Sequence, residues 1–239
     1  RLRALGLRRV HCVGSLKADL VTPHRADDAW LATQGLDPSK PLLLLASTSA
    51  GLSGRPSEEA VVLGEDLARW RERGWQVAIA PRHPERGDEV ATLVQRLGGA
   101  SRRSSRGERL DRADAVLVVD EIGRLNALYA HCAASLGIAV VGGSLGSGRH
   151  GQNMLEAAAA GCCTVVGPDT RNFPDAMALL QAAGAVTVLD LPPDPAVLGD
   201  LAAVPGHRRR LGERAQAVWA ASKGSLGRTE RLLRGIAWD

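Results

Sequence analysis

Short apolar runs alternate with longer amphipathic segments along most of the chain. Six runs carry apolar residues at consecutive positions, as in strands buried on both faces: 42–46, 76–80, 115–119, 139–141, 164–166 and 186–189. Between them lie five segments of helical length with apolar residues three or four positions apart: 58–73, 88–97, 124–133, 153–160 and 174–183. Strands that alternate with helices predict an α/β fold, a doubly wound parallel sheet with right-handed crossovers.

The two ends of the chain depart from this alternation. The proline-rich segment 191–195 closes the last predicted strand, and the residues after it have the pattern of a helical tail. We therefore expect a globular domain over residues 23–205 and a helical tail over residues 206–239. Residues 1–22 are expected to lead into the domain, and Arg1 falls within a segment patterned like a helix. This start, without Met, predicts a piece excised from a longer protein.

Composition and charge narrow the class of partner. Hydrophobic residues make up 45% and charged residues 23% of the 239 positions, which argues against a largely disordered chain. Trp, Tyr and Phe make up only 3%, so a platform that stacks single-stranded nucleic acid on aromatic rings is not expected. The formal net charge of +4 is carried mostly by arginine, which binds phosphates and carboxylates bidentately. An anionic partner is one interpretation, and an Ala- and Arg-rich composition inherited from a GC-rich genome is the other.

Cysteine spacing and run length bear on location and metals. The four cysteines show no C-x-x-C spacing and no paired framework, which predicts reduced thiols in the cytoplasm. No apolar run approaches about 18 residues, so no segment is predicted to span a membrane. No second His or Cys stands at ligand spacing from His83, so we expect neither a metal nor a cofactor.

Binding chemistry is expected in loops that follow strands, because parallel sheets bind ligands at the carboxyl ends of their strands. The first such loop, residues 47–54, begins with Ser47 and Thr48 and leads into a helix with two glutamates in its first turn. Its hydroxyls and the free N–H groups of that helix would hold an anion. The alternative is a surface turn in which Ser57 caps the helix.

The second loop carries Arg82 and His83 between two prolines. Prolines restrict the backbone and exclude a continuing helix, so both side chains would be held at a strand end. A solvated run of charges is the alternative. The fourth loop, residues 167–175, follows the strand predicted at 164–166, which comes next after the strand at 139–141. It is expected either to lie beside the third loop, which follows that strand, or to be a plain turn capped by Asp175.

The third segment, residues 140–157, has the richest pattern. A buried strand leads into Gly142, Gly143 and Ser144, and a helix is predicted to begin at about Asn153. Glycines let the backbone approach a ligand, and a helix N-terminus attracts anions. Glu156 would either form a capping box with Asn153 or accept hydrogen bonds from the hydroxyls of a ribose. The glycines match neither G-x-G-x-x-G nor a P-loop, so they identify nothing alone.

Six motifs together resemble the C-terminal half of the 3-deoxy-D-manno-octulosonic acid (Kdo) transferases, and their order and spacing agree over nearly the whole chain. In chain order they are Gly14-Ser15-Leu16-Lys17-x-Asp19, Arg82-His83-Pro84-Glu85-Arg86, Asp120-Glu121-Ile122-Gly123-Arg124-Leu125, Val141-Gly142-Gly143-Ser144-Leu145, Asn153-x-Leu155-Glu156 and Asn172-Phe173-x-Asp175.

The resemblance implies a Rossmann-like domain, the C-terminal half of a GT-B glycosyltransferase. Such an enzyme inverts the anomeric configuration of the transferred sugar and needs no metal. Such enzymes move Kdo from CMP-Kdo, a cytidine monophosphate sugar, to a lipid A precursor at the cytoplasmic face of the bacterial inner membrane, with peripheral membrane association and no nucleic acid as partner. In this family the C-terminal domain binds the nucleotide sugar.

Carried over by residue, the resemblance assigns contacts to the donor. Arg82 and His83 would contact CMP, and Ser144 with its neighbouring glycines would border the phosphate and sugar. Asn153 would meet the anionic donor, and Glu156 would hold the ribose. The further candidates for the donor site are Lys17, Ser47, Thr48 and Gly123.

Several positions depart from the family pattern. Ser15 stands in place of Asn, Gln152 in place of a His that is displaced to His150, and Met154 and Ala157 in place of prolines. The Ser-Thr-His-x-Gly-Glu segment of the family is replaced by residues 47–50 with extra residues after them. Because these positions lie at the expected donor site, the sugar and the nucleotide stay open.

The family's other half, with its acceptor surface and catalytic carboxylate, has no counterpart in this sequence. Inverting transfer requires a base opposite the leaving group, so we expect no catalytic residue in this chain. Two alternatives stay open: a non-catalytic nucleotide-binding or interaction domain, and another GT-B enzyme such as a nucleotide-sugar epimerase.

Overall fold

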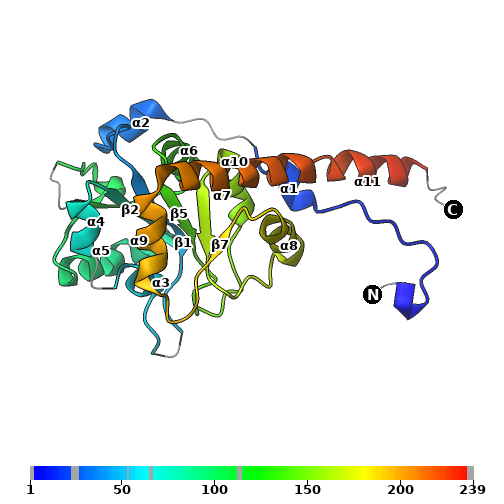
Figure 1. Cartoon of the computed structure of the whole chain (residues 1–239), viewed down its shortest axis with the longest axis horizontal. Helices are drawn as coiled ribbons and strands as arrows, with labels where there is room; N and C mark the ends of the chain where they lie inside the picture. The colour runs from blue at the N-terminus through cyan, green and yellow to red at the C-terminus, as the bar shows by residue number, and fades with distance from the viewer. Residues whose placement is uncertain (1–2, 23–26, 53, 65–66, 112–114, 236–239) are drawn as a thin grey trace.

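An all-parallel sheet forms the centre of the computed structural model, which describes residues 3–22, 27–52, 54–64, 67–111 and 115–235 (Figure 1). Within these residues the sheet has seven strands in the order β3-β4-β2-β1-β5-β6-β7. The strands are β1 (Leu42–Thr48), β2 (Gln76–Pro81), β3 (Ala100–Arg103), β4 (Ala115–Val118), β5 (Ile138–Val141), β6 (Cys163–Val166) and β7 (Thr187–Val188). The doubly wound α/β fold predicted from the alternation is confirmed.

Helices cover both faces of the sheet. One face carries α1 (Leu16–Leu20), α2 (Asp28–Thr33), α6 (Leu125–Ala134), α7 (Met154–Ala160), α8 (Pro174–Ala182) and most of α10 (Pro205–Ser222). The other carries α3 (Glu58–Leu63), α4 (Leu67–Glu72), α5 (Gly87–Arg96) and α9 (Pro195–Ala203). Alternate residues of β1 divide between the two cores: Leu44 packs on the first and Leu43 on the second. The continuous apolar runs therefore bury both faces of each central strand.

Two predicted elements differ in the structure, and one strand was not predicted. The predicted helix 58–73 is two helices, since α3 ends at Gly64, whose φ of 48° leaves the helical region; residues 65 and 66 lie outside the described part. The predicted helix at the N-terminus was wrong beyond a single turn, Arg3–Leu5, because Leu5 is 73% exposed and has no core to pack on. β3 was missed because its sequence, Ala-Ser-Arg-Arg, lacks an apolar run and gains its strand form from pairing with β4 at the sheet edge.

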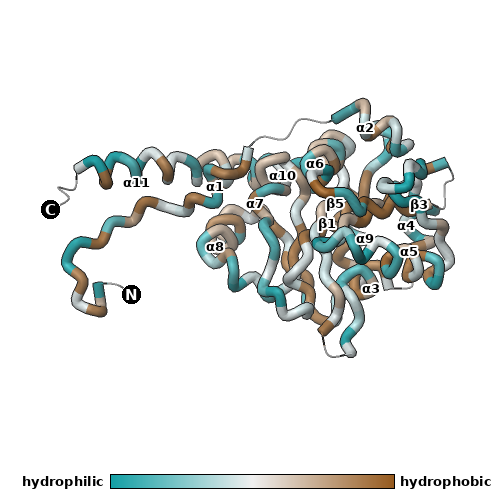
Figure 2. Tube along the Cα trace, turned by 180° about the vertical axis from the view of Figure 1, so that it is seen from behind, coloured by the Kyte–Doolittle hydropathy of each residue, from teal (hydrophilic) through white to brown (hydrophobic). Residues whose placement is uncertain are grey.

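The tail is helical through α10 and α11 (Ser225–Arg234), while Trp238 lies outside the described residues. α10 packs against α7 and β6, and its Trp219 donates a hydrogen bond from Nε1 to the carbonyl of Ala18 in α1, at 3.2 Å. The Asp19 carboxylate accepts hydrogen bonds from the N–H groups of Gly224 and Leu226, both at 2.6 Å, at the start of α11. These bonds lower the pKa of Asp19. The N-terminal segment and α11 project together from one end of the molecule (Figures 1 and 2), and the boundaries at residues 22 and 205 stay predictions.

None of the helices in the described residues is long and apolar enough to cross a bilayer.

Candidate functional site

The loops after β2, β1 and β5 lie side by side at the carboxyl edge of the sheet. The N–H of Arg82, just after β2, donates to the carbonyl of Thr48 at the end of β1, at 2.9 Å. On the other side of β1, the N–H of Gly142 donates to the carbonyl of Ala46 at 2.8 Å. Ser47, with a φ of 54°, therefore lies between the loop that carries Arg82 and the loop that begins with Gly142 and Gly143, which we call the glycine loop. The topology brings together loops that are about 60 residues apart in the chain, as expected for parallel strands.

Arg82 and Glu156 both lie at this edge, close enough for the charge of Arg82 to act on the Glu156 carboxyl. The Arg82 side chain is exposed and makes no hydrogen bond or ion pair with any described residue. Glu156 is half-buried on α7, and burial raises its pKa, while the hydrogen bond from Asn153 and the positive charge of Arg82 act in the opposite direction. An unpaired guanidinium thus lies near a carboxylate whose charge is partly desolvated. This pairing suits a ligand that has both an anion and hydroxyl groups.

Asn153 caps α7 and also holds Glu156. Its Oδ1 accepts from the N–H of Leu155 at 3.3 Å, and its Nδ2 donates to Oε1 of Glu156 at 3.0 Å. In a capping box the glutamate would accept from the backbone N–H of Asn153 instead. Asn153 therefore caps the helix, but the hydrogen bond from its backbone N–H to Glu156 that would complete a capping box is not among those of the described residues. Oε2 of Glu156 accepts no hydrogen bond from the described residues.

The glycine loop requires glycine at its first two positions. A Cβ on Gly142 would lie 2.6 Å from the carbonyl oxygen of Ser47, and Gly143 has a φ of 78°. Ser144 is buried, and its hydroxyl donates to the carbonyl of Val141 at 3.0 Å and accepts from the N–H of Gly167 at 2.8 Å. The hydroxyl that we expected to border a ligand thus joins the ends of β5 and β6. Its contact with a ligand stays a prediction.

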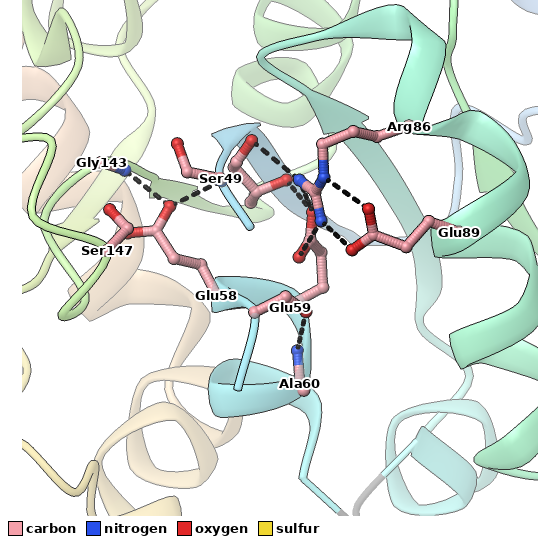
Figure 3. Close-up of polar contacts among 10 residues, drawn as sticks. Ser49, Glu58, Glu59, Ala60, Arg86, Glu89, Gly143 and Ser147 are labelled. Carbon is pink, nitrogen blue, oxygen red and sulfur yellow. Dashed lines mark hydrogen bonds and ion pairs between the residues drawn. The ribbon is translucent and has the colours of Figure 1, made fainter. Parts of the chain in front are cut away.

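Glu58 and Glu59, which we expected in the first turn of a helix, are fully buried at this edge (Figure 3). Glu58 accepts hydrogen bonds from the N–H groups of Ser49, Gly143 and Leu145 at 2.9, 2.6 and 2.8 Å, and from the hydroxyl of Ser147 at 3.2 Å. A carboxylate of the protein thus occupies the N–H groups that the glycine loop would offer to a phosphate.

Glu59 points the other way along the edge (Figure 3). It accepts from the Thr48 hydroxyl at 2.6 Å and from both terminal nitrogens of Arg86, at 2.9 and 3.2 Å. The Thr48 hydroxyl, which we expected at an anion site in the first loop, donates within the protein to Glu59, and its part in anion binding stays a prediction. The alternative was right in part: Ser57 caps α3 by accepting from the N–H of Ala60 at 3.4 Å, while Ser53 lies outside the described residues.

The remaining candidates lie at the rim. Lys17 donates from Nζ to the carbonyl of Asn172 at 3.2 Å and lies 4.1 Å from the centre of the Phe173 ring, so it fixes the loop after β6. His83 is exposed, with Nδ1 3.4 Å from a carboxylate oxygen of Glu85. Gly123 is exposed after β4, with a φ of 87°. None of these three reaches the Arg82–Glu156 pair through a hydrogen bond of the described residues.

The loops after β5 and β6 are tied to each other. Asn172 donates from Nδ2 to the carbonyls of Arg149 and Gly151, at 2.9 and 3.2 Å. Nδ1 of His150 lies 2.9 Å from a carboxylate oxygen of Asp169, which also pairs with Arg171. The fourth loop is therefore part of the same assembly of loops.

The Asp120 motif has a structural role next to this edge. Its carboxylate accepts from Nε of Arg103 at 2.7 Å and from the N–H and hydroxyl of Ser105 at 3.0 and 2.7 Å. Burial alone would raise the pKa of Asp120, but the hydrogen bonds of Ser105 and Arg103 outweigh it and lower the pKa. Asp120 thus joins the ends of β3 and β4.

Known proteins are similar to this chain in sequence. The chain is 35% identical over 242 residues to the 3-deoxy-D-manno-octulosonic acid transferase of Bordetella pertussis, covering 96% of the chain and 52% of that protein. It is also 35% identical over 133 residues to a probable mitochondrial enzyme of the same name from Arabidopsis thaliana, covering 55% of the chain and 29% of that protein. No family model matches the chain.

Solved structures point the same way. The crystal structure of the C-terminal CMP-Kdo binding domain of WaaA from Acinetobacter baumannii is similar with a TM-score of 0.67 and 27% identity, over 80% of this chain and 94% of that one. WaaG, a glycosyltransferase involved in lipopolysaccharide biosynthesis, shares the fold with a TM-score of 0.51 and 13% identity, over 86% of this chain and 49% of that one.

The all-parallel sheet flanked by helices, shared with these structures, defines a Rossmann-like domain of the GT-B glycosyltransferase class. Within that class the chain belongs to the Kdo transferase family, as its motifs predicted. It spans about half the length of the first curated relative that it matches.

Proposed function

We propose that this chain is the donor-binding part of a glycosyltransferase that takes Kdo or a related sugar from a CMP-sugar. The observation that carries the proposal is that the Arg82 guanidinium, which makes no hydrogen bond or ion pair with the described residues, lies close enough to the half-buried Glu156 to act on its charge. Arg82 would neutralise the phosphate, as a guanidinium does bidentately. Oε2 of Glu156 would accept from the ribose hydroxyls, as the acidic residue does in nucleotide-binding folds.

The surrounding residues would orient the donor. Asn153 would contact it beside Glu156, His83 would border the CMP portion, and the backbone at Gly142 and Gly143 would let the sugar approach closely. Lys17 and Gly123 would act at the rim, through the loops that they belong to or contact. The relatives that bear the Kdo transferase name extend the proposal. The sugar acceptor would be a lipid A precursor, and the enzyme would act at the cytoplasmic face of a bacterial inner membrane.

Calorimetric titration of the 239-residue chain with CMP and with UMP tests the donor proposal. We expect CMP to bind and UMP to bind more weakly, because the similar domain from Acinetobacter baumannii is a CMP-Kdo binding domain. Preference for UMP would point to another GT-B enzyme. Binding of neither nucleotide would contradict the proposal and favour an interaction domain.

The chain alone is expected to transfer no sugar. Inverting transfer needs a carboxylate base on the acceptor hydroxyl. Glu58 and Glu59 are buried, and both carboxylate oxygens of each already accept hydrogen bonds. Incubation with CMP-Kdo and a lipid A precursor, followed by mass spectrometry, should give product only at the level of a protein-free control. Product above that level would show that a carboxylate of this chain serves as the base.

A further inference from the structure

The first turn of α3 places two buried carboxylates next to each other in the chain and aims them at different loops (Figure 3). Neither loop belongs to α3. Buried carboxylates are costly unless they are fully hydrogen-bonded, so a pair at adjacent positions requires a specific set of partners. The hydrogen-bond donors to Glu58 include Gly143 and Leu145 of the glycine loop, and those to Glu59 include Arg86 of the loop that carries Arg82.

Glu59 is connected to Arg82 through one arginine and one carbonyl. Arg86, held by both carboxylate oxygens of Glu59, also donates from a terminal nitrogen to the carbonyl of Thr48 at 3.3 Å. The N–H of Arg82 donates to the same carbonyl at 2.9 Å. The hydrogen bonds at this carbonyl therefore set where β1 ends and where the Arg82 side chain begins.

Glu58 is connected to Glu156 through the glycine loop. It accepts from the N–H of Gly143, whose carbonyl accepts from the N–H of Gly151 at 2.7 Å. Gln152 in turn donates from its N–H to the carbonyl of Gly142 at 2.9 Å, immediately before the Asn153 cap of α7. The glycine loop thus closes on itself directly ahead of Glu156, with Glu58 as its anchor.

We propose that Glu58 and Glu59 are positioning residues that set the separation of Glu156 and Arg82, and hence the fit to the phosphate and ribose of a nucleotide. The proposal rests on the function proposed above. Because the two glutamates are consecutive residues of one helical turn, the two loops share a single anchor with little freedom between them. Neither glutamate touches the ligand, so each acts through a different member of the pair.

A double-mutant cycle on CMP affinity, measured by NMR titration, tests this division. Glu59→Gln should weaken binding about tenfold in the parent and have little effect in Arg82→Ala, since residues that act through one another are non-additive. Glu58→Gln should behave in the same way with Glu156→Gln. The crossed pair, Glu59→Gln with Glu156→Gln, should be additive. Additivity within both cycles would overturn the proposal.

Matched controls separate positioning from stability. Arg86 also contacts the carboxylate of Glu89, at 2.8 Å, and the Glu89 side chain is 56% exposed. Glu89→Gln removes that carboxylate and should leave the affinity for CMP nearly unchanged. An equal loss in Glu89→Gln and Glu59→Gln would overturn the assignment to Glu59. Where Glu58→Gln fails to fold, Ser147→Ala removes one donor to Glu58 and should give a smaller loss with the same coupling to Glu156→Gln.

Amide exchange without nucleotide keeps this proposal separate from the donor function. Glu59→Gln should speed exchange of the Arg82 N–H about tenfold, and Glu58→Gln that of the Gly151 N–H, while Leu44 in the middle of β1 is unchanged. Failure of the parent to bind CMP or UMP would contradict the donor function, and the exchange rates would still decide the positioning roles. Unchanged exchange at Arg82 and Gly151, or equal acceleration at Leu44, would overturn them.

Discussion

Arg82→Ala should remove most of the affinity for CMP. The guanidinium is exposed at the strand edge and has no partner among the described residues, so its charge is available to a phosphate. A lost hydrogen bond to a charged group costs about 1.5–3 kcal/mol, which is roughly a ten- to hundredfold loss in affinity, and a bidentate contact lies at the upper end. Calorimetry on the folded variant measures the loss directly.

Charge and geometry can be separated at this position. Arg82→Lys should lose only part of the affinity, because it keeps the charge and loses the bidentate geometry. Added salt should weaken the parent more than Arg82→Ala, since screening acts on the charge that was removed. Arg96→Ala, an exposed arginine in the last turn of α5, is the matched control and should bind as the parent does. CMP binding by Arg82→Ala at the parent's affinity would remove Arg82 from the donor site.

Glu156→Gln should weaken CMP binding about ten- to hundredfold, because a neutral amide replaces a charged acceptor of ribose hydrogen bonds. Thermal stability should not fall. Burial raises the pKa of Glu156 above its ordinary value of 4.5, so the folded protein holds the charged carboxylate less well than the unfolded chain does. The charge therefore costs stability at neutral pH, and replacing it with an amide removes that cost. A cap that mattered only for stability would give the opposite pair of results.

The pH dependence follows from the same shift. In the parent, CMP affinity should fall as pH decreases through the raised pKa of Glu156, because the protonated carboxyl is a weaker acceptor. This component should be absent from Glu156→Gln. In Arg82→Ala it should move to higher pH, since the positive charge of Arg82 lowers that pKa. The measurement is a set of titrations at several pH values from 5 to 8, with phosphate ionisation corrected by a reference nucleotide. If Glu156 took no part, the ratio of the CMP affinity of the parent to that of Glu156→Gln would not change with pH.

The layers of the fold, and the loops that lie at the carboxyl edge of the sheet, could be predicted from the amino-acid sequence. Strands buried on both faces need apolar residues at consecutive positions, and amphipathic helices need them three or four apart, so both patterns are readable within a few residues. The parallel order of strands then places the residues after Ala46, Ala80 and Val141 at one edge. The prediction that Arg82, Gly143 and Asn153 share that edge depended only on these local patterns.

Which polar groups in those loops are free depends on contacts between segments that are distant in the sequence. Glu58 and the Gly143 N–H that it accepts from are 85 positions apart, and a glutamate in the first turn of a helix is ordinarily exposed. Burial of Glu58 and Glu59 is stable only because distant segments supply N–H, hydroxyl and guanidinium donors, and no local pattern carries that information. For the same reason the Ser144 hydroxyl is used between strands, while Arg82, equally polar in sequence, is left open to a ligand.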